Sequence, residues 1–429
     1  MATLFNANGL QRFYKFGVLV TFFAVLTDGF DTAILSMLVP HLAEDWGISP
    51  AAFSYPLALT NFGVVIGYLV SGPVAEKFSE KKVLIWGLIV FGGATAITAM
   101  TLPLESIAWL TVSRGLTGLG LGVVMPNAVV VGTQQVPEKN RQPVSVFVTM
   151  GIISGATVAG FAGGHLISGL GTSGVLWLAA VAPLLAAVLL QVFVPTVSRF
   201  TEETSSQGDH GKVLSVEVFA RLLRGRRRYI TLTLWAASFL IFTITYTFKS
   251  WIPTLFSEYG MSTHAAGMGL AYYSLGGVIA GLLLIPTSAK FGTGRAMFVM
   301  TAIAAICTAI LGSASMGEIL IMLTVFVIGA GITTGTIGMT AMCVALYDRS
   351  TRTTGIAVTL AFGRAGSIFG PAIGGALMAF HWSAQSIVML LALPLAITAI
   401  GWALLNRLAK SRASSEPVVE ETPLAKKTQ

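Results

Sequence analysis

The chain has 429 residues, of which 54% are hydrophobic and only 10% are charged, and its formal net charge is +8. This composition excludes a soluble enzyme and is typical of a protein that crosses a membrane many times. The positive charge gives no indication of a nucleic-acid partner, because nearly all of it lies in the connections between apolar segments, where it sets orientation in the membrane.

Apolar segments long enough to cross a bilayer follow one another along the chain, which predicts an all-α membrane protein of the twelve-helix kind. The predicted spans are residues 16–42, 53–75, 83–102, 106–131, 143–168, 174–194, 228–252, 264–286, 295–314, 317–345, 353–378 and 383–406. They divide the chain into an N-terminal six-helix bundle (1–194), a cytoplasmic linker loop (195–227), a C-terminal six-helix bundle (228–408) and a disordered cytoplasmic tail (409–429). Arg12 and Lys15 precede the first run as in a signal peptide, but the run is too long and carries two acids, so we expect a retained helix.

The two halves of the chain repeat each other at an offset of 211 residues. Gly118 and Gly120 return as Gly329 and Gly331, and a loop arginine after the fourth span returns after the tenth. Three further glycines return at the same offset, namely Gly155, Gly163 and Gly164 as Gly366, Gly374 and Gly375. One constant offset with matching elements in order predicts two six-helix bundles in parallel orientation.

Lysine and arginine are distributed on one side of the predicted membrane. Three of the 26 lie within spans, and the other 23 all fall on one side, while the opposite loops hold only acids and histidines. The positive-inside rule therefore places both termini and the long central loop in the cytoplasm. We expect a multi-pass protein of the cytoplasmic (inner) membrane.

The first predicted span carries two acids near its middle. Asp28 and Asp31 are three residues apart, so they share one face of a helix, and Gly29 between them allows a backbone or a substrate to come close. A carboxylate at that depth costs about 2.5–3.5 kcal/mol on insertion scales and needs a polar cavity, a partner or a proton. Intramembrane acids usually mark ion or substrate paths, which favours proton coupling, although a polar packing patch between helices is the alternative.

Arginines occupy two other spans. From a helix rise of ~1.5 Å per residue, Arg114 lies at a depth similar to that of Asp28 and Asp31, and Arg364 lies close to the midplane. A guanidinium matches a carboxylate in planar, bidentate geometry, so Arg114 and Arg364 are candidate binding groups for an anionic substrate. For Arg364, a brace between helices through carbonyl groups is equally consistent with the sequence. Lys249 lies near the outer end of its span and is expected to extend its amine toward the membrane surface.

Aromatic side chains in the spans could hold a substrate ring. Tyr246 and Tyr272 are the stronger candidates, since a phenol can both stack and form hydrogen bonds, and Phe30 is a third. The two cysteines, Cys307 and Cys343, lie in apolar segments and indicate no disulfide framework. The sequence contains no metal-ligand cluster, catalytic triad or phosphate-binding loop, so we expect no enzyme activity, no metal and no cofactor.

Several of these stretches resemble the major facilitator superfamily, and more narrowly its aromatic acid:proton symporters. The matching stretches are DGFDTAIL (28–35), RGLTGLGLGVVMPNA (114–128), SWIPTLFSEYGMS (250–262) and TGIAVTLAFGRAGSIFGPAIGG (354–375). The resemblance implies uptake of benzoate-type carboxylates driven by protons, and it implies that Asp28, Asp31 and Arg114 are needed for transport.

The loop after the second span departs from the superfamily pattern Gly-x-Leu-Ala-Asp-Arg-x-Gly-Arg-Arg. Residues 72–81 read GPVAEKFSEK, so the pattern's second glycine is Ser79 and the arginine after it is Glu80. The loop resembles a cytoplasmic latch. The candidate gating residues are Gly72, Glu76, Lys77 and Lys81 in this loop, with Arg141 after the fourth span and Arg352 after the tenth.

The sequence therefore predicts a monomeric secondary transporter that imports an aromatic carboxylate with protons by rocking two bundles around a midplane site. Two alternatives are a proton symporter of another organic anion, such as a sugar acid or dicarboxylate, and a drug:proton antiporter. Arg114 and Arg364 argue against the antiporter, whose substrates are cationic or neutral. A transport-dead sensor with the central loop as its output is the remaining reading, but that loop shows no domain pattern.

Overall fold

A computed structural model describes residues 7–195, 222–224, 227–313, 316–347 and 349–413, and its regular elements in those ranges are helices. The long helices are α1 (Ala7–Asp45), α2 (Ser54–Phe78), α3 (Glu80–Thr101), α4 (Ile107–Gln134), α5 (Glu138–Phe193), α7 (Arg227–Glu258), α8 (Thr263–Phe291), α9 (Thr293–Ser313), α10 (Glu318–Leu346), α11 (Arg349–Ala379) and α12 (Ala384–Ala413). Two short 3-10 helices, η1 (Pro50–Phe53) and η2 (Leu102–Leu104), lie in loops.

Ten segments of the described residues are long and apolar enough to cross a membrane. They differ from the twelve predicted spans at two places. The fifth and sixth spans form one apolar segment, Val144–Phe193, and the described residues of α11 supply none of the ten. The all-α membrane fold is confirmed.

Within α5, the helical path is broken at Gly171, whose φ of +70° and ψ of 173° favour glycine. This residue lies between the predicted spans 143–168 and 174–194, so α5 contains both of them. At the other end of the chain, α12 continues to Ala413, past the predicted start of the tail at 409. The residues AKSRA that extend it beyond 408 are mostly good helix formers. Most of the predicted linker and tail lies outside the described residues.

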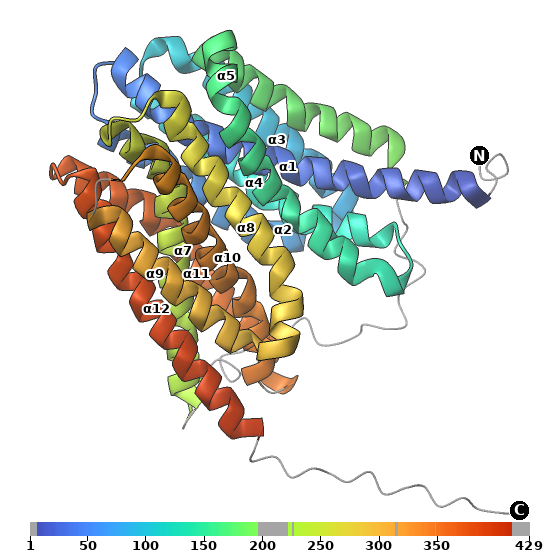
Figure 1. Ribbon diagram of the computed structural model, residues 1–429. Coiled ribbons are helices and arrows are strands. Elements are labelled where there is room, and N and C mark those ends of the chain that lie inside the picture. Colours follow the sequence, from blue (N-terminus) through green and yellow to red (C-terminus); the bar gives the residue numbers. More distant parts are fainter. Residues whose placement is uncertain (1–6, 196–221, 225–226, 314–315, 348, 414–429) are drawn as a thin grey trace, which may run out of the picture.

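The helices pack as two groups with the same internal arrangement (Figure 1). In the first group α1 packs on α5 and α2 on α4, and in the second α7 packs on α11 and α8 on α10. The repeated glycines occupy equivalent contacts. Gly118 faces the backbone of Thr60 in α2, and Gly329 faces the backbone of Tyr273 in α8. The internal repeat predicted from the sequence is therefore a repeat of helix packing.

The two groups contact each other mainly through α5 with α8 and through α2 with α11, with a further contact between α1 and α7. Gly160 of α5 lies against Ala271 of α8, and Gly375 of α11 lies against Ser54 of α2. Figure 1 shows the groups side by side at one end and spread apart at the other, where α1 begins and α12 ends. A polar region enclosed between the groups is therefore positioned at the convergence of α1, α2, α7 and α11.

The packing of α1 on α5 depends on the glycine between the two acids. A Cβ atom at Gly29 would collide with the backbone carbonyl of Ile152 in α5. The expectation that Gly29 allows a close approach is confirmed, and the approaching group is a backbone. This contact fixes the rotation of α1 about its own axis, and so the directions in which Asp28 and Asp31 point.

Candidate functional site

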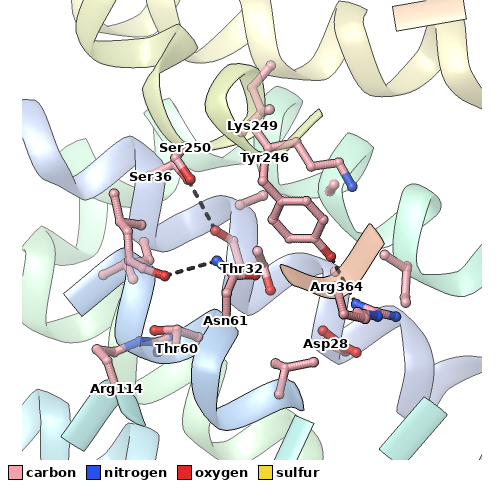
Figure 2. A pocket seen from close by; sticks show the side chains of 18 of the residues that line it. Asp28, Thr32, Ser36, Thr60, Asn61, Arg114, Tyr246, Lys249, Ser250 and Arg364 are labelled. Atoms are coloured by element: carbon pink, nitrogen blue, oxygen red, sulfur yellow. Dashed lines mark hydrogen bonds between the residues drawn. The ribbon is translucent and has the colours of Figure 1, made fainter. Parts of the chain in front are cut away.

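A polar cavity of about 60 Å³ lies where the two helix groups meet (Figure 2). Polar side chains from both groups face it. They are Asp28, Thr32, Ser36, Thr60, Asn61, Tyr68 and Arg114 from the first group and Tyr246, Lys249, Ser250 and Arg364 from the second. A charged cavity inside an apolar helix bundle is the arrangement expected for a substrate or ion path.

Asp31 and Arg114 form a buried ion pair between α1 and α4. Arg114 Nη1 donates to Asp31 Oδ1 at 3.0 Å, and Nη2 donates to Oδ2, so the pair is bidentate. The Thr95 hydroxyl of α3 also donates to Oδ1, at 3.3 Å. Both charged side chains are fully buried. Both terminal nitrogens of Arg114 therefore donate to Asp31, and its Nε is the one guanidinium nitrogen without a hydrogen-bond partner.

Asp28 is in a different environment from Asp31. It lines the cavity on the side of Arg364 and is partly exposed to that space (Figure 2). Among the described residues, no cation lies within ion-pair distance of Asp28. Of the two acids, Asp28 is the one that a substrate or a proton can reach from the cavity.

Arg364 joins the two helix groups across the cavity. Its Nη2 donates to the Tyr68 hydroxyl of α2 at 2.8 Å, and its Nη1 donates to the Tyr246 hydroxyl of α7 at 3.3 Å. Its guanidinium also stacks over the Tyr68 ring, with Cζ 4.4 Å from the ring centroid. Two neutral phenol oxygens thus occupy the positions at which a carboxylate would bind the guanidinium in bidentate geometry.

Lys249 also lines the cavity, contrary to the expectation that it reaches the membrane surface. Its Nζ lies 5.6 Å from the centroid of the Tyr246 ring. The side chain is half-buried. The physical reason for the difference is that α7 packs against α1 at the bundle interface, so the Lys249 side chain meets the polar space between the two helix groups.

Two predicted substrate residues do not reach the cavity. Tyr272 of α8 packs edge-on against Phe161 of α5, with ring centroids 5.9 Å apart, and Phe30 is buried in the apolar core. Tyr68, which the sequence analysis did not select, does reach it. The sequence does not predict which way a tyrosine two turns from the cytoplasmic end of a span points, because only the packing of the helices shows which neighbour it faces.

The predicted gating residues lie close to helix ends, at the end of α2 and at the starts of α3, α5 and α11. Gly72 has open space beside it, Lys77 lies over the Phe78 ring, and Lys81 Nζ donates to the Gln191 carbonyl at 3.4 Å. The side chains of Glu76, Arg141 and Arg352 lie outside the described residues. Ser79, where the superfamily pattern has glycine, adopts a φ of +88°, so the turn keeps a backbone conformation that favours glycine.

Comparison with known proteins relates this chain to transporters. The profile of the Major Facilitator Superfamily matches residues 21–335 and 234–428. The chain is 29% identical over 428 residues to the 4-hydroxybenzoate transporter PcaK of Acinetobacter baylyi, covering 92% of each chain. It is 28% identical to the gallate transporter of Pseudomonas putida, covering 92% of this chain and 93% of that one. It is 25% identical to the 3-(3-hydroxy-phenyl)propionate transporter of Escherichia coli, with 83% and 85% covered.

Solved structures show the same fold. A bacterial homologue of the human lysosomal transporter Spinster, in an inward-facing and unoccupied conformation, superimposes with a TM-score of 0.72 at 15% identity, covering 93% of this chain and 98% of that one. The nucleoside transporter NupG superimposes with a TM-score of 0.73 at 13% identity, covering 91% of this chain and 99% of that one.

Among the described residues, no group of His, Cys, Asp and Glu side chains is arranged to hold a metal ion.

Proposed function

Because this chain belongs to the Major Facilitator Superfamily, we propose that it is a transporter that imports an aromatic carboxylate together with protons. The observation that carries the proposal is the cavity in which Arg364 is held by two phenols from opposite helix groups, with Asp28 on the same side. The relatives named as transporters of 4-hydroxybenzoate and gallate support the substrate class.

Arg364 is the proposed receptor for the substrate carboxylate. Its planar guanidinium matches a carboxylate in bidentate geometry. The corresponding donors of Arg114 already bind the carboxylate of Asp31. When substrate enters, its carboxylate replaces the Tyr68 and Tyr246 hydroxyls on the guanidinium. The two rings then provide faces against which an aromatic ring can stack.

The charges of the cavity suggest how protons are coupled. With Asp31 and Arg114 cancelling each other, the empty site carries Asp28, Arg364 and Lys249, a net charge of one positive when Asp28 is ionised. A monoanionic substrate bound with one proton on Asp28 leaves the same net charge. The loaded and empty transporters therefore face the same electrostatic cost of crossing the low-dielectric membrane, which favours co-transport of proton and anion.

Asp28 is the better proton carrier of the two acids. Protonating Asp31 would break a buried bidentate ion pair, and removing one charge of such a pair leaves the other uncompensated. Protonating Asp28 breaks no ion pair within the described residues, and the cavity gives a proton access to it. Asp31 is then the residue that holds Arg114 and fixes α1 against α4.

The cavity must enlarge to admit an aromatic acid. Its volume of about 60 Å³ is well below the ~150 Å³ of a protein cavity known to hold a benzene ring. The side chains around it come from both helix groups, so rocking one group against the other changes its size and exposure. With both termini in the cytoplasm, the spread ends face the cytoplasm and the closed ends face outward.

The experiment that tests the function is uptake by purified protein in liposomes under an inward proton gradient. We expect benzoate and hydroxybenzoates to accumulate and to compete with one another. A sugar acid, an aliphatic dicarboxylate and a cationic drug serve as comparison substrates. Accumulation of one of these in place of the aromatic acids would assign the protein to the corresponding alternative.

Replacing Arg364 with Lys should weaken aromatic acid binding about ten- to hundredfold although the charge is kept, because one charge-assisted hydrogen bond of the fork is lost. The methyl ester of the acid should bind poorly to the parent protein. Affinity is measured by ligand-dependent thermal shift, with the unliganded melting temperature as the control for folding. Equal binding of acid and ester, or a purely structural loss in R364K, would show that Arg364 is a brace between helices.

The proposed orientation in the inner membrane predicts which positions a membrane-impermeant thiol reagent can label. In a chain with Cys307 and Cys343 replaced by Ser, a cysteine at Asp45 or Glu318 should react in intact cells. A cysteine at Gly292 should react only after permeabilisation, because the positive-inside rule places that loop in the cytoplasm. Labelling at Gly292 in intact cells would reverse the topology.

A further inference from the structure

Lys249 is a cation for which the transport mechanism above has no specific role beyond its charge. It extends from α7 into the cavity that also holds Arg364, Tyr246 and Asp28 (Figure 2). Within the described residues, no carboxylate lies within ion-pair distance of its amine, and its one described contact is the face of the Tyr246 ring, at 5.6 Å. A cation in the membrane interior whose only described partner is an aromatic face points to a ligand that supplies a stronger partner for the ammonium.

The surroundings of Lys249 identify what kind of partner is missing. The charged groups that face the same space are Asp28 of α1 and Arg364 of α11, and Tyr246 lies against both cations. The Tyr246 hydroxyl accepts from Arg364, while its ring face contacts Lys249. The two cations therefore belong to one site but are held at different parts of one aromatic ring, so one carboxylate group need not satisfy both.

We propose that Lys249 is a specificity-determining residue that binds a second oxygen of the substrate, so that the site prefers aromatic acids with a ring hydroxyl over the unsubstituted acid. This inference rests on the proposed function. The two cations are suited to different groups of the substrate. The Arg364 fork suits the two oxygens of a carboxylate, whereas the ammonium of Lys249 is a compact charge with three rotatable donors that suits a single oxygen.

Other lining groups can complete the contact with a hydroxyl. Ser250 follows Lys249 on α7, and Thr32, Ser36 and Asn61 line the same cavity from the first helix group. A ring hydroxyl both donates and accepts, so it can accept from Lys249 while donating to one of these oxygens or to Asp28. An unsubstituted ring would leave the ammonium with only an aromatic face as its partner.

The test compares the affinities of benzoate and of 2-, 3- and 4-hydroxybenzoate for the parent protein and for K249Q, by competition against a radiolabelled aromatic acid. We expect at least one hydroxybenzoate to bind the parent about tenfold more tightly than benzoate, the effect of one charge-assisted hydrogen bond. In K249Q that ratio should fall to about one, while benzoate keeps measurable binding through Arg364. K290Q, which removes an exposed lysine at the end of α8, is the matched control and should keep the parent ratio.

The result that overturns the proposal is a parent protein that binds benzoate and every hydroxybenzoate equally, or a K249Q protein that loses all four acids by the same factor. The second outcome would make Lys249 a general source of positive charge. If K249Q does not fold, K249R is measured instead, and a change in the hydroxybenzoate-to-benzoate ratio is again the expected result. A parent protein that binds none of the four acids contradicts the proposed function itself, which separates the two failures.

Discussion

Replacing Asp28 with Asn is expected to abolish accumulation of the aromatic acid driven by a pH gradient, while exchange of labelled for unlabelled acid continues. The asparagine imitates a permanently protonated Asp28. The loaded transporter then keeps its usual charge, but the empty transporter carries one extra positive charge and returns across the membrane poorly. Exchange never requires the empty form to return, so it survives.

The measurement is uptake and exchange on the same preparation of folded D28N protein. Asp45→Asn is the matched control, because Asp45 is an exposed acid at the end of the same helix and should leave both activities unchanged. Full pH-driven accumulation by D28N would exclude Asp28 as the proton carrier. If the folded D28N protein loses both exchange and accumulation, Asp28 instead has a role in binding the acid.

Breaking the ion pair between Asp31 and Arg114 is expected to have the largest effect on stability. Removing one partner leaves a fully buried charge uncompensated, which costs about 3–5 kcal/mol. We expect both D31N and R114Q to lower the unfolding temperature and the yield of folded protein. The double variant D31N/R114Q removes both charges and leaves two amides that can bond to each other and to Thr95, so it should recover most of the loss.

The same double variant tests whether Arg114 binds substrate, as the sequence predicts. In the structure its terminal nitrogens are held by Asp31, so the double variant should bind aromatic acids within a few-fold of the parent through Arg364. Unfolding is followed by thermal denaturation in detergent, and binding by thermal shift with ligand. A double variant that is stable but binds no acid would show that Arg114 contributes to substrate binding.

The sequence alone determined the membrane fold, because lipid allows few solutions. Apolar segments of sufficient length specify the spans without knowledge of which helices touch, and loops that differ in lysine and arginine predict an orientation. The repeat at an offset of 211 residues predicted two matching bundles, and the equivalent contacts of Gly118 and Gly329 are its structural form. Ionisable residues inside spans are rare and costly, so Asp28, Asp31, Arg114 and Arg364 could be selected by position alone.

Only the tertiary structure decided how those residues are partnered. Helix rise gives depth, but the direction of a side chain about the helix axis depends on how the helix is rotated against its neighbours. Asp28 and Asp31 differ by about 60° in that direction. The contact of Gly29 with the α5 backbone sets the rotation, which turns Asp31 toward Arg114 and leaves Asp28 facing the cavity. The same reason explains Tyr68 and Lys249, whose places in the site follow from neighbours far away in the chain.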